Sequence, residues 1–187
     1  MVIVSGAPGT GKTTLSGSLA GNLGLPLIAR DDLKERLADV LLPEVTSGAT
    51  PVEGVDSTAL GRASYALLFA ITDRLLKGGA GVIIESNFRR GTAEPELTPL
   101  VEHAAAVLVH CEAPRTVVIE RVLARAGRDD RHPIHPDLDR LADLERDLTD
   151  GTFEPLDLGI EAIRVDTTNG YVPSFDALVA RIRTAIG

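Results

Sequence analysis

The sequence predicts an α/β fold in which a five-stranded parallel sheet carries helices on both faces. Short apolar runs typical of buried strands alternate with longer segments whose apolar residues recur every three to four positions, as on helices. This alternation implies right-handed crossovers and a parallel sheet. Polar or glycine-rich residues also follow the strands, at the edge where such sheets bind ligands. The expected strands are Met1–Ser5, Leu25–Ala29, Gly81–Asn87, Ala106–Cys111 and Ile160–Val165.

The helices are predicted from apolar stripes and from their end signals. Leu15, Leu19 and Leu23 form the stripe of the first helix, which ends at Gly24. The others are expected at residues 33–41, with Asp31 or Asp32 as N-cap, at 60–75, at 92–105, from 114 onward and at 175–186. The Gly-, Pro- and Ser-rich residues 43–56 lack periodicity and favour a loop, either a substrate-side flap or a plain surface excursion.

The most specific pattern is Gly6-Ala7-Pro8-Gly9-Thr10-Gly11-Lys12-Thr13, which fits G-x-x-x-x-G-K-[ST] at every fixed position. It lies between the first strand and the first helix, the context in which this pattern forms a phosphate-binding loop. The glycines allow backbone N–H groups to turn around an oxyanion, Lys12 reaches the terminal phosphates, and Thr13 offers its hydroxyl to Mg²⁺. The helix dipole points at the same place. We therefore expect ATP or GTP, with Mg²⁺, to bind here.

Composition limits the partners of the chain. The 187 residues carry a net charge of −8 and are 44% hydrophobic, as expected for a single domain that spans 1–187. The acidic field makes nucleic acid and anionic membranes poor partners. Cys111 is the only cysteine, which excludes an intrachain disulfide and favours a reducing compartment. No apolar run is long enough to span a membrane. We expect a cytoplasmic monomer or homodimer.

Carboxylates follow the second and third strands. Asp31 and Asp32 come directly after the second strand, where one of them can accept a proton from an acceptor hydroxyl and the other can cap a helix. We prefer Asp31 as the base. Glu85 ends an apolar strand, the position from which a carboxylate supports Mg²⁺ directly or through water, and Asn87 next to it can hold substrate or form an Asx turn.

Arginines gather in the segment that follows the fourth strand. Arg121 and Arg125 are one helical turn apart, and Arg128 shares their face if the helix continues; Arg131 follows. An exposed basic face is the simple interpretation of such a run. This one leads into a polar segment able to close over a site, a lid at about 125–137, whose arginines would neutralise charge on a transferring phosphoryl group.

Two further polar groups are less specific. His132 and His135 do not complete a zinc site with one distant cysteine, so they are expected to order the lid or to touch substrate. The segment from Asp166 to Gly170, which includes Thr167, follows the last strand and can approach the nucleotide base, although a plain turn explains its composition equally well.

These parts in this order resemble the P-loop kinases with an adenylate-kinase-like core, particularly the small AAA-domain kinase family (AAA_33-like) that neighbours chloramphenicol phosphotransferase, zeta toxin, gluconate kinase and polynucleotide kinase. The resemblance is carried by Gly6–Thr13, Arg30–Lys34, Val82–Asn87 and Arg121–Arg131 with the following His132-Pro133. It implies a P-loop NTPase three-layer sandwich with strand order 2-3-1-4-5, Asp31 as the acceptor-side base, and lid arginines at the phosphates. The chain lacks the Asp-Gly signature of nucleoside monophosphate kinases after the third strand, which argues against that activity.

The predicted function is transfer of the γ-phosphoryl group of ATP or GTP to a hydroxyl of a small molecule, for which an antibiotic or a nucleoside-like compound is conceivable. Two alternatives remain: a polynucleotide 5′-hydroxyl kinase, because Arg-Asp-Asp-x-Lys resembles the Arg-Asp-Asp-x-Arg of that group, and a regulatory NTPase that hydrolyses slowly. The candidate residues are, for catalysis, Lys12, Asp31, Arg121, Arg125, Arg128 and Arg131; for the nucleotide, Gly6, Ala7, Pro8, Gly9, Thr10, Gly11, Lys12, Thr13, Thr14, Arg125 and Thr167; for the acceptor, Asp31, Asp32, Lys34, Asn87, Arg89 and His132; and for the metal, Thr13 and Glu85.

Overall fold

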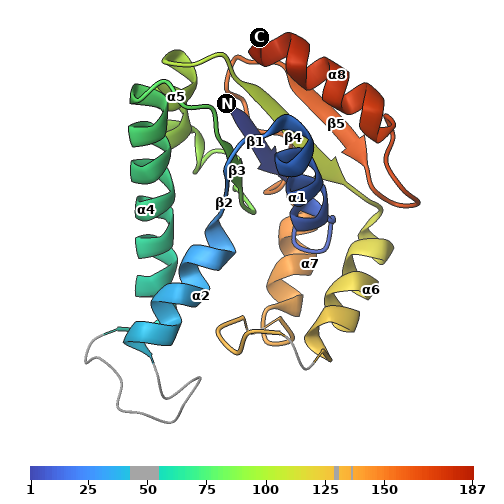
Figure 1. The fold of residues 1–187 in the computed structure, drawn as a ribbon. Coiled ribbons are helices and arrows are strands. Elements are labelled where there is room, and N and C mark those ends of the chain that lie inside the picture. Colours follow the sequence, from blue (N-terminus) through green and yellow to red (C-terminus); the bar gives the residue numbers. More distant parts are fainter. Residues whose placement is uncertain (43–54, 129–130, 136) are drawn as a thin grey trace.

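The computed structural model describes residues 1–42, 55–128, 131–135 and 137–187. Its central sheet confirms the predicted α/β fold: five parallel strands lie in the order β2-β3-β1-β4-β5 (Figure 1). The strands are β1 (Val2–Ser5), β2 (Leu27–Ala29), β3 (Ile83–Glu85), β4 (Val107–Glu112) and β5 (Ala162–Asp166). The inner strands are apolar runs because both of their faces are covered.

Helices cover both faces of this sheet. In the part of the chain that the structure describes they are α1 (Lys12–Leu23), α2 (Arg30–Leu41), α4 (Ser57–Lys77), α5 (Glu94–Glu102), α6 (Arg115–Ala126), α7 (Leu141–Thr149) and α8 (Phe175–Ile186). Alternate residues of β1 point to opposite cores. Val4 packs with Leu19 of α1 and Ile182 of α8, whereas Ile3 packs with Leu68 of α4 and Leu97 of α5. The result is the expected three-layer sandwich.

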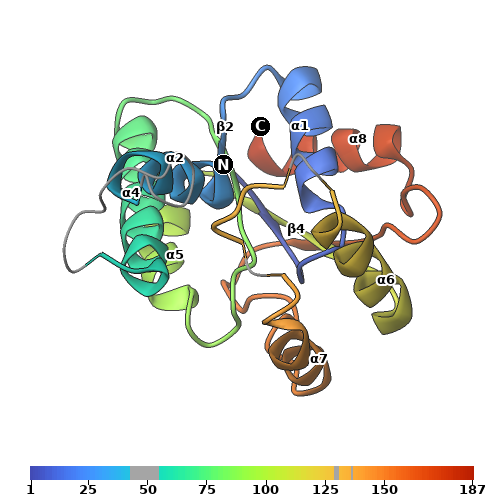
Figure 2. The same ribbon diagram turned by 90° about the horizontal axis from the view of Figure 1, so that it is seen from below.

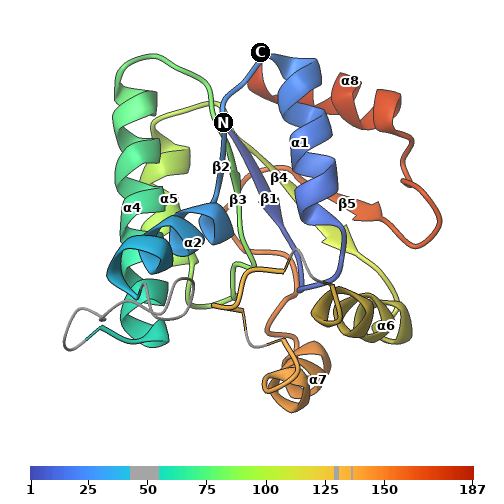
Figure 3. The same cartoon turned by 60° about the horizontal axis from the view of Figure 1, so that its bottom comes forward.

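The carboxyl ends of the strands meet at one edge of the sheet, and three helices surround that edge. Figure 3 shows the strands running toward α2, α6 and α7, and Figure 2, seen from below, shows these helices around the space beyond the strands. Val118 and Val122 of α6 pack against Leu144 of α7. Ile134 of the lid segment is 5% exposed and packs against Ala38 of α2, so this part of the lid segment lies beside α2. The fold therefore brings loop, acids and arginines together.

The start of α2 differs from the prediction. The helix begins at Arg30, its N-cap is Ala29 in an extended conformation, and no side chain caps it. The expectation that Asp31 or Asp32 is the N-cap is therefore wrong. Strand β2 runs into the helix without a linker, so both acids fall in its first turn, where they complement the helix dipole.

Other boundaries also differ. Strand β3 is shorter than expected, and the expected helix at residues 92–105 is confined to α5, which retains Pro99 in its interior. Helix α7 was not predicted. The loop expected at residues 43–56 lies mostly outside the described residues; within it, Asp56 is the N-cap of α4 and accepts a hydrogen bond from the N–H of Ala59. Within the described residues, no helix has the length and apolar character that a membrane span requires.

Candidate active site

The loop between β1 and α1 has the backbone of a phosphate-binding loop. Gly6, Gly9 and Gly11 have φ values of +140°, +82° and +77°, which L side chains rarely adopt. A Cβ atom on Gly6 would lie 2.2 Å from the carbonyl oxygen of Cys111, and one on Gly9 would lie 2.8 Å from that of Val118. No side chain caps the N-terminus of α1. The first N–H groups of the helix are therefore left to an anion.

Lys12 lies folded over this loop. Its side chain is 5% exposed, and its Nζ donates a hydrogen bond to the carbonyl oxygen of Ala7 at 2.9 Å. Burial lowers the pKa of Lys12, although the nearby carboxylates of Glu85 and Asp31 oppose that effect. An ammonium group held at a glycine-rich loop beside a helix N-terminus is a binding arrangement for phosphate oxygens.

Thr13 and Glu85 lie together beside the loop. The hydroxyl of Thr13 donates to Oε2 of Glu85 at 3.1 Å, which joins the first turn of α1 to the end of β3. Burial raises the pKa of Glu85, whereas the charge of Lys12 acts in the opposite direction. A hydroxyl oxygen and a carboxylate are hard oxygen ligands of the kind that Mg²⁺ prefers, so the residues present fit this ion. Thr14, the next residue, is exposed on α1.

Asp31 lines a cavity of about 110 Å³ between the loop and the lid segment. Pro8 of the loop, Asn87 after β3 and Arg125 of α6 line the same cavity. Burial alone would raise the pKa of Asp31, but His135, Arg30 and the other cations around it outweigh burial and lower the pKa. Asp31 is therefore a carboxylate at neutral pH, the form that can accept a proton.

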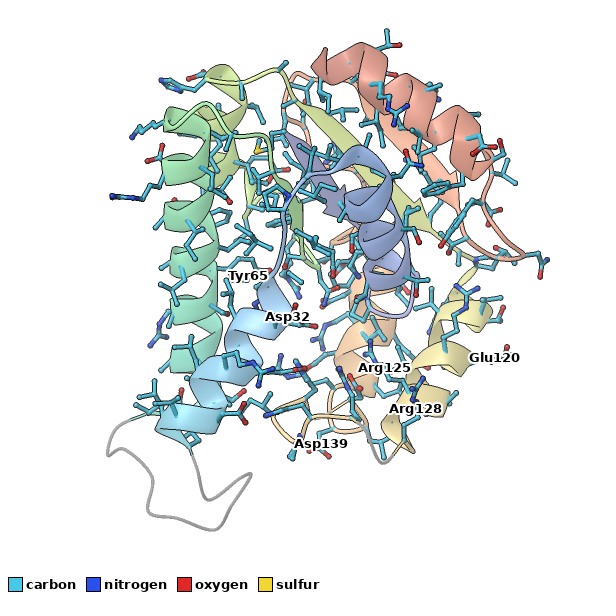
Figure 4. All side chains as sticks on the ribbon, viewed as in Figure 1. Asp32, Tyr65, Glu120, Arg125, Arg128 and Asp139 are labelled. Atoms are coloured by element: carbon cyan, nitrogen blue, oxygen red, sulfur yellow. The ribbon has the colours of Figure 1, made fainter. Side chains whose placement is uncertain are left out.

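The remaining residues predicted to bind the acceptor do not all lie in the Asp31 cavity. Lys34 lines the Asp31 cavity, whereas Asp32 is exposed in the first turn of α2 (Figure 4). Burial and the neighbouring Glu35 raise the pKa of Asp32. Arg89 forms a bidentate ion pair with Asp147 of α7 at 2.7 and 3.0 Å and lines an adjoining cavity of about 380 Å³ that also contains Asn87.

Two of the predicted arginines are held as a pair by one carboxylate. Asp137 accepts hydrogen bonds from Nε and NH2 of Arg125 at 3.1 and 2.8 Å, and from Nε and NH2 of Arg131 at 2.8 and 3.2 Å. Its side chain is 12% exposed, and all three residues line the Asp31 cavity. In Figure 4 the side chain of Arg125 extends from α6 toward the centre of the molecule. Among the described residues, the NH1 groups of Arg125 and Arg131 have no hydrogen-bond partner, so they can donate to a further anion.

Arg121 contacts the phosphate-binding loop and the turn after β5, and not Asp137. Its guanidinium donates to the carbonyl oxygens of Gly9, Thr167 and Thr168. Thr167 is 6% exposed, and its hydroxyl donates to the carbonyl oxygen of Thr10 at 2.8 Å. Both side chains brace the phosphate-binding loop against the turn after β5 and do not line the Asp31 cavity.

The other lid residues join the lid segment to α2. His132 lies 3.2 Å from Asp39 and His135 lies 2.8 Å from Glu35, in each case between Nε2 and a carboxylate oxygen. The N–H of Ile134 donates to Nδ1 of His132. His135 lines the Asp31 cavity, whereas His132 does not. Helix α6 ends at Ala126, and Arg128 therefore does not continue the helical face of Arg121 and Arg125.

Asp137, Arg140 and Arg30 line the Asp31 cavity without having been predicted as site residues. Arg30 belongs to the run that carries the resemblance, so that run was the available signal for it. Asp137 and Arg140 lie in the turn residues directly before α7, where spacing in the sequence does not specify which side chains converge.

Comparison with known proteins identifies related chains. Residues 1–149 match the model of an AAA domain family, AAA_33. An uncharacterized protein of Mycobacterium tuberculosis is 31% identical over 137 residues, which cover 68% of this chain and 26% of that protein. The chain thus spans about a quarter of the length of that curated relative.

Solved structures share the fold. A candidate kinase from Chloroflexus aurantiacus is 34% identical, with a TM-score of 0.81, and the match covers 100% of this chain and 97% of that one. A sugar kinase from Janibacter is 22% identical, with a TM-score of 0.60 over 98% of this chain and 92% of that one. The second likeness concerns the fold alone.

Proposed function

The chain belongs to this AAA domain family, and from that premise we propose that it is an ATP- or GTP-dependent kinase that transfers the γ-phosphoryl group to a hydroxyl of a small molecule. One observation carries the proposal. The carboxylate of Asp31, the loop residue Pro8 and the guanidinium groups of Arg125 and Arg131 line a single cavity. A base for an acceptor hydroxyl and cations for a transferring phosphoryl group thus lie beside the phosphate-binding loop.

The proposed chemistry is in-line transfer. The loop N–H groups and Lys12 bind the donor phosphates, and Asp31 accepts the proton of the acceptor hydroxyl as that oxygen attacks the γ-phosphorus. Arg125 and Arg131 stabilise the charge on the transferring group. Thr13 and Glu85 would hold Mg²⁺, which neutralises charge on the phosphate oxygens when it is bound. Arg121 supports the loop through its carbonyl oxygens in this structure.

The acceptor is expected to extend from Asp31 into the adjoining cavity. Asn87 and Arg30 line both the Asp31 cavity and the adjoining cavity, so the two cavities are neighbours. An acceptor that places its hydroxyl at Asp31 can extend into the adjoining space, which is about 380 Å³. That volume suits a small molecule.

A polynucleotide 5′-hydroxyl kinase is a second candidate, because the adjoining cavity is lined by Arg30, Arg89, Arg140 and Arg146. Three of these arginines are already paired, Arg30 with Asp31, Arg89 with Asp147 and Arg146 with Asp143. The positive charge left to attract a nucleic acid backbone is therefore small. For this reason we favour a small-molecule acceptor.

The test is a pair of adjacent substitutions, Asp31→Asn and Asp32→Asn. With γ-labelled ATP and pools of hydroxyl compounds that include a 5′-hydroxyl oligonucleotide, Asp31→Asn should lower transfer about 10²- to 10⁴-fold, the usual contribution of a general base. Asp32→Asn should retain most of the activity. Both variants should bind a fluorescent ATP analogue like the original protein.

Other outcomes would separate the alternatives. Transfer to the oligonucleotide alone would identify the second candidate. Nucleotide hydrolysis that occurs without any transfer and is unchanged in Asp31→Asn would support a regulatory NTPase and contradict the kinase proposal.

A further inference from the structure

Lys34 is a buried cation that has no carboxylate partner among the described residues. Its side chain lies on α2 and is 4% exposed. Its Nζ donates to the hydroxyl oxygen of Ser57 at 3.1 Å and lies 3.5 Å from the carbonyl oxygen of Ile134, and both of these acceptors are neutral. Among the described residues no ion pair involves Lys34. A buried charge without a counterion lowers the stability of the folded protein, so a buried lysine at this position suggests a functional role.

The surroundings of Lys34 are positive as well. Burial lowers the pKa of Lys34 to about 8, and Arg30, Arg140 and Arg131 act in the same direction. Asp31 is the carboxylate that opposes them. This group of cations lowers the free energy of any anion that enters beside Asp31.

Arg30 and Arg140 line the Asp31 cavity together with Lys34. Arg30 is fixed in place, because its Nε donates to Ser64 at 3.0 Å and its guanidinium lies 4.7 Å from the ring centre of Tyr65. Its NH1 also donates to Oδ1 of Asp31 at 3.3 Å, so its charge is partly balanced. Figure 4 shows Tyr65 on the side of α4 that faces α2. Arg140 is exposed and forms no ion pair within the part of the chain that is described.

These three cations are distinct from those expected at the donor phosphates. Arg125 and Arg131 share Asp137, and Lys12 covers the phosphate-binding loop. Lys34 sits one helical turn beyond Asp31 on α2. Since Arg30 and Arg140 also line the adjoining cavity, positive charge continues to the side where the acceptor is expected.

We propose that the acceptor carries an anionic group, a carboxylate or a phosphate, near its reacting hydroxyl, and that Lys34 binds this group together with Arg140 and Arg30. The inference rests on the proposed kinase function and adds the chemical class of the acceptor. The anion supplies the counterion that Lys34 lacks, and it holds the hydroxyl within reach of Asp31.

The test titrates Lys34 directly and needs no knowledge of the acceptor. The phosphate-binding loop is first filled with Mg²⁺ and a non-hydrolysable ATP analogue, and the pKa of Lys34 is followed by NMR of its side-chain ammonium group. Inorganic phosphate or acetate is then added at constant ionic strength. A bound anion should raise the pKa of Lys34 from about 8 toward the ordinary lysine value of 10.5.

The two probes distinguish a phosphate-bearing acceptor from one with a carboxylate. In the Arg140→Gln variant, the anion that raises the pKa of Lys34 should have to be at least threefold more concentrated to do so. Lys77→Gln, on the exposed end of α4, should leave that concentration unchanged. An unchanged pKa of Lys34 with both anions would overturn the proposal. If the ATP analogue itself failed to bind, the proposed function would fail instead.

Discussion

Asp137 accepts two hydrogen bonds from the guanidinium of Arg125, at 3.1 and 2.8 Å, in the cavity that also contains Asp31. The same carboxylate accepts two from Arg131, so it neutralises part of the repulsion between two cations. This arrangement fixes both arginines before any phosphate arrives. It also lowers the pKa of Asp137 against the opposing effect of burial, so the carboxylate is ionised at neutral pH.

Asp137→Asn should therefore slow phosphoryl transfer with little effect on nucleotide affinity. We expect a loss of about 10- to 100-fold, smaller than the roughly 10³–10⁵ attributed to a whole arginine finger, because the arginines remain but lose their orientation. Steady-state rates and a nucleotide titration measure the two effects. Asp139→Asn is the matched control, since Asp139 is exposed in the same segment (Figure 4). An unchanged rate in Asp137→Asn would show that the ion pairs are structural only.

Glu85→Gln tests the metal role assigned to the pair of Thr13 and Glu85. The substitution keeps the size of the side chain and a hydrogen-bond partner for Thr13 but removes the negative charge. We expect the Mg²⁺ concentration that gives half-maximal nucleotide turnover to rise about 10-fold or more. Glu112→Gln, at the end of β4, should leave that concentration unchanged. Equal Mg²⁺ dependence in both variants would contradict the assignment.

Gly6→Ala should destabilise the whole fold. A methyl group would meet the carbonyl oxygen of Cys111 at 2.2 Å, on a residue whose φ is +140°. We expect a loss of about 3 kcal/mol or more in the free energy of unfolding, measured by urea denaturation. Gly17→Ala is the control, because Gly17 lies in α1 with nothing within 4 Å of the added methyl. Alanine there should stabilise the protein by about 0.5–1 kcal/mol. Similar changes in the free energy of unfolding for Gly6→Ala and Gly17→Ala would contradict this prediction.

The sequence predicted the structure best where the conformation depends on residues that are adjacent in the chain. The turns of Gly6–Thr13 require glycine at fixed positions, and the apolar strands that flank them determine where the loop lies in the sheet. Helix α7 was missed although Leu141, Leu144 and Leu148 have helical spacing, which was the available signal. The packing of Leu144 against Val118 and Val122 of α6 places this helix beside the site.

The arrangement of charges could not be predicted in the same way. Arg121 and Arg125 are one turn apart on α6, yet one contacts the carbonyl oxygen of Gly9 and the other contacts Asp137. Which partner each finds depends on the path of the lid segment and of the turn after β5. These paths are set by packing between distant elements, such as Ile134 against α2, and not by residue spacing.

Lys34→Met should make the protein more stable at neutral pH. Below pH 8 the ammonium is charged in both states, and the folded state bears the cost of burying it. As the pH rises from about 8 to 10.5, folded Lys34 loses its proton while unfolded Lys34 keeps it, so the original protein gains stability across that window. The advantage of the methionine variant should therefore be largest below pH 8 and should shrink up to pH 10.5.

Denaturation curves at several pH values measure the difference in stability between Lys34→Met and the original protein. The control is Lys77→Met, at an exposed lysine, which should change stability by no more than about 0.5 kcal/mol at any of these pH values. A Lys34→Met variant that is less stable at pH 7 would mean that the bonds to Ser57 and Ile134 outweigh the burial of charge. A stabilised variant would instead fit a chain that keeps a costly buried cation for binding an anion.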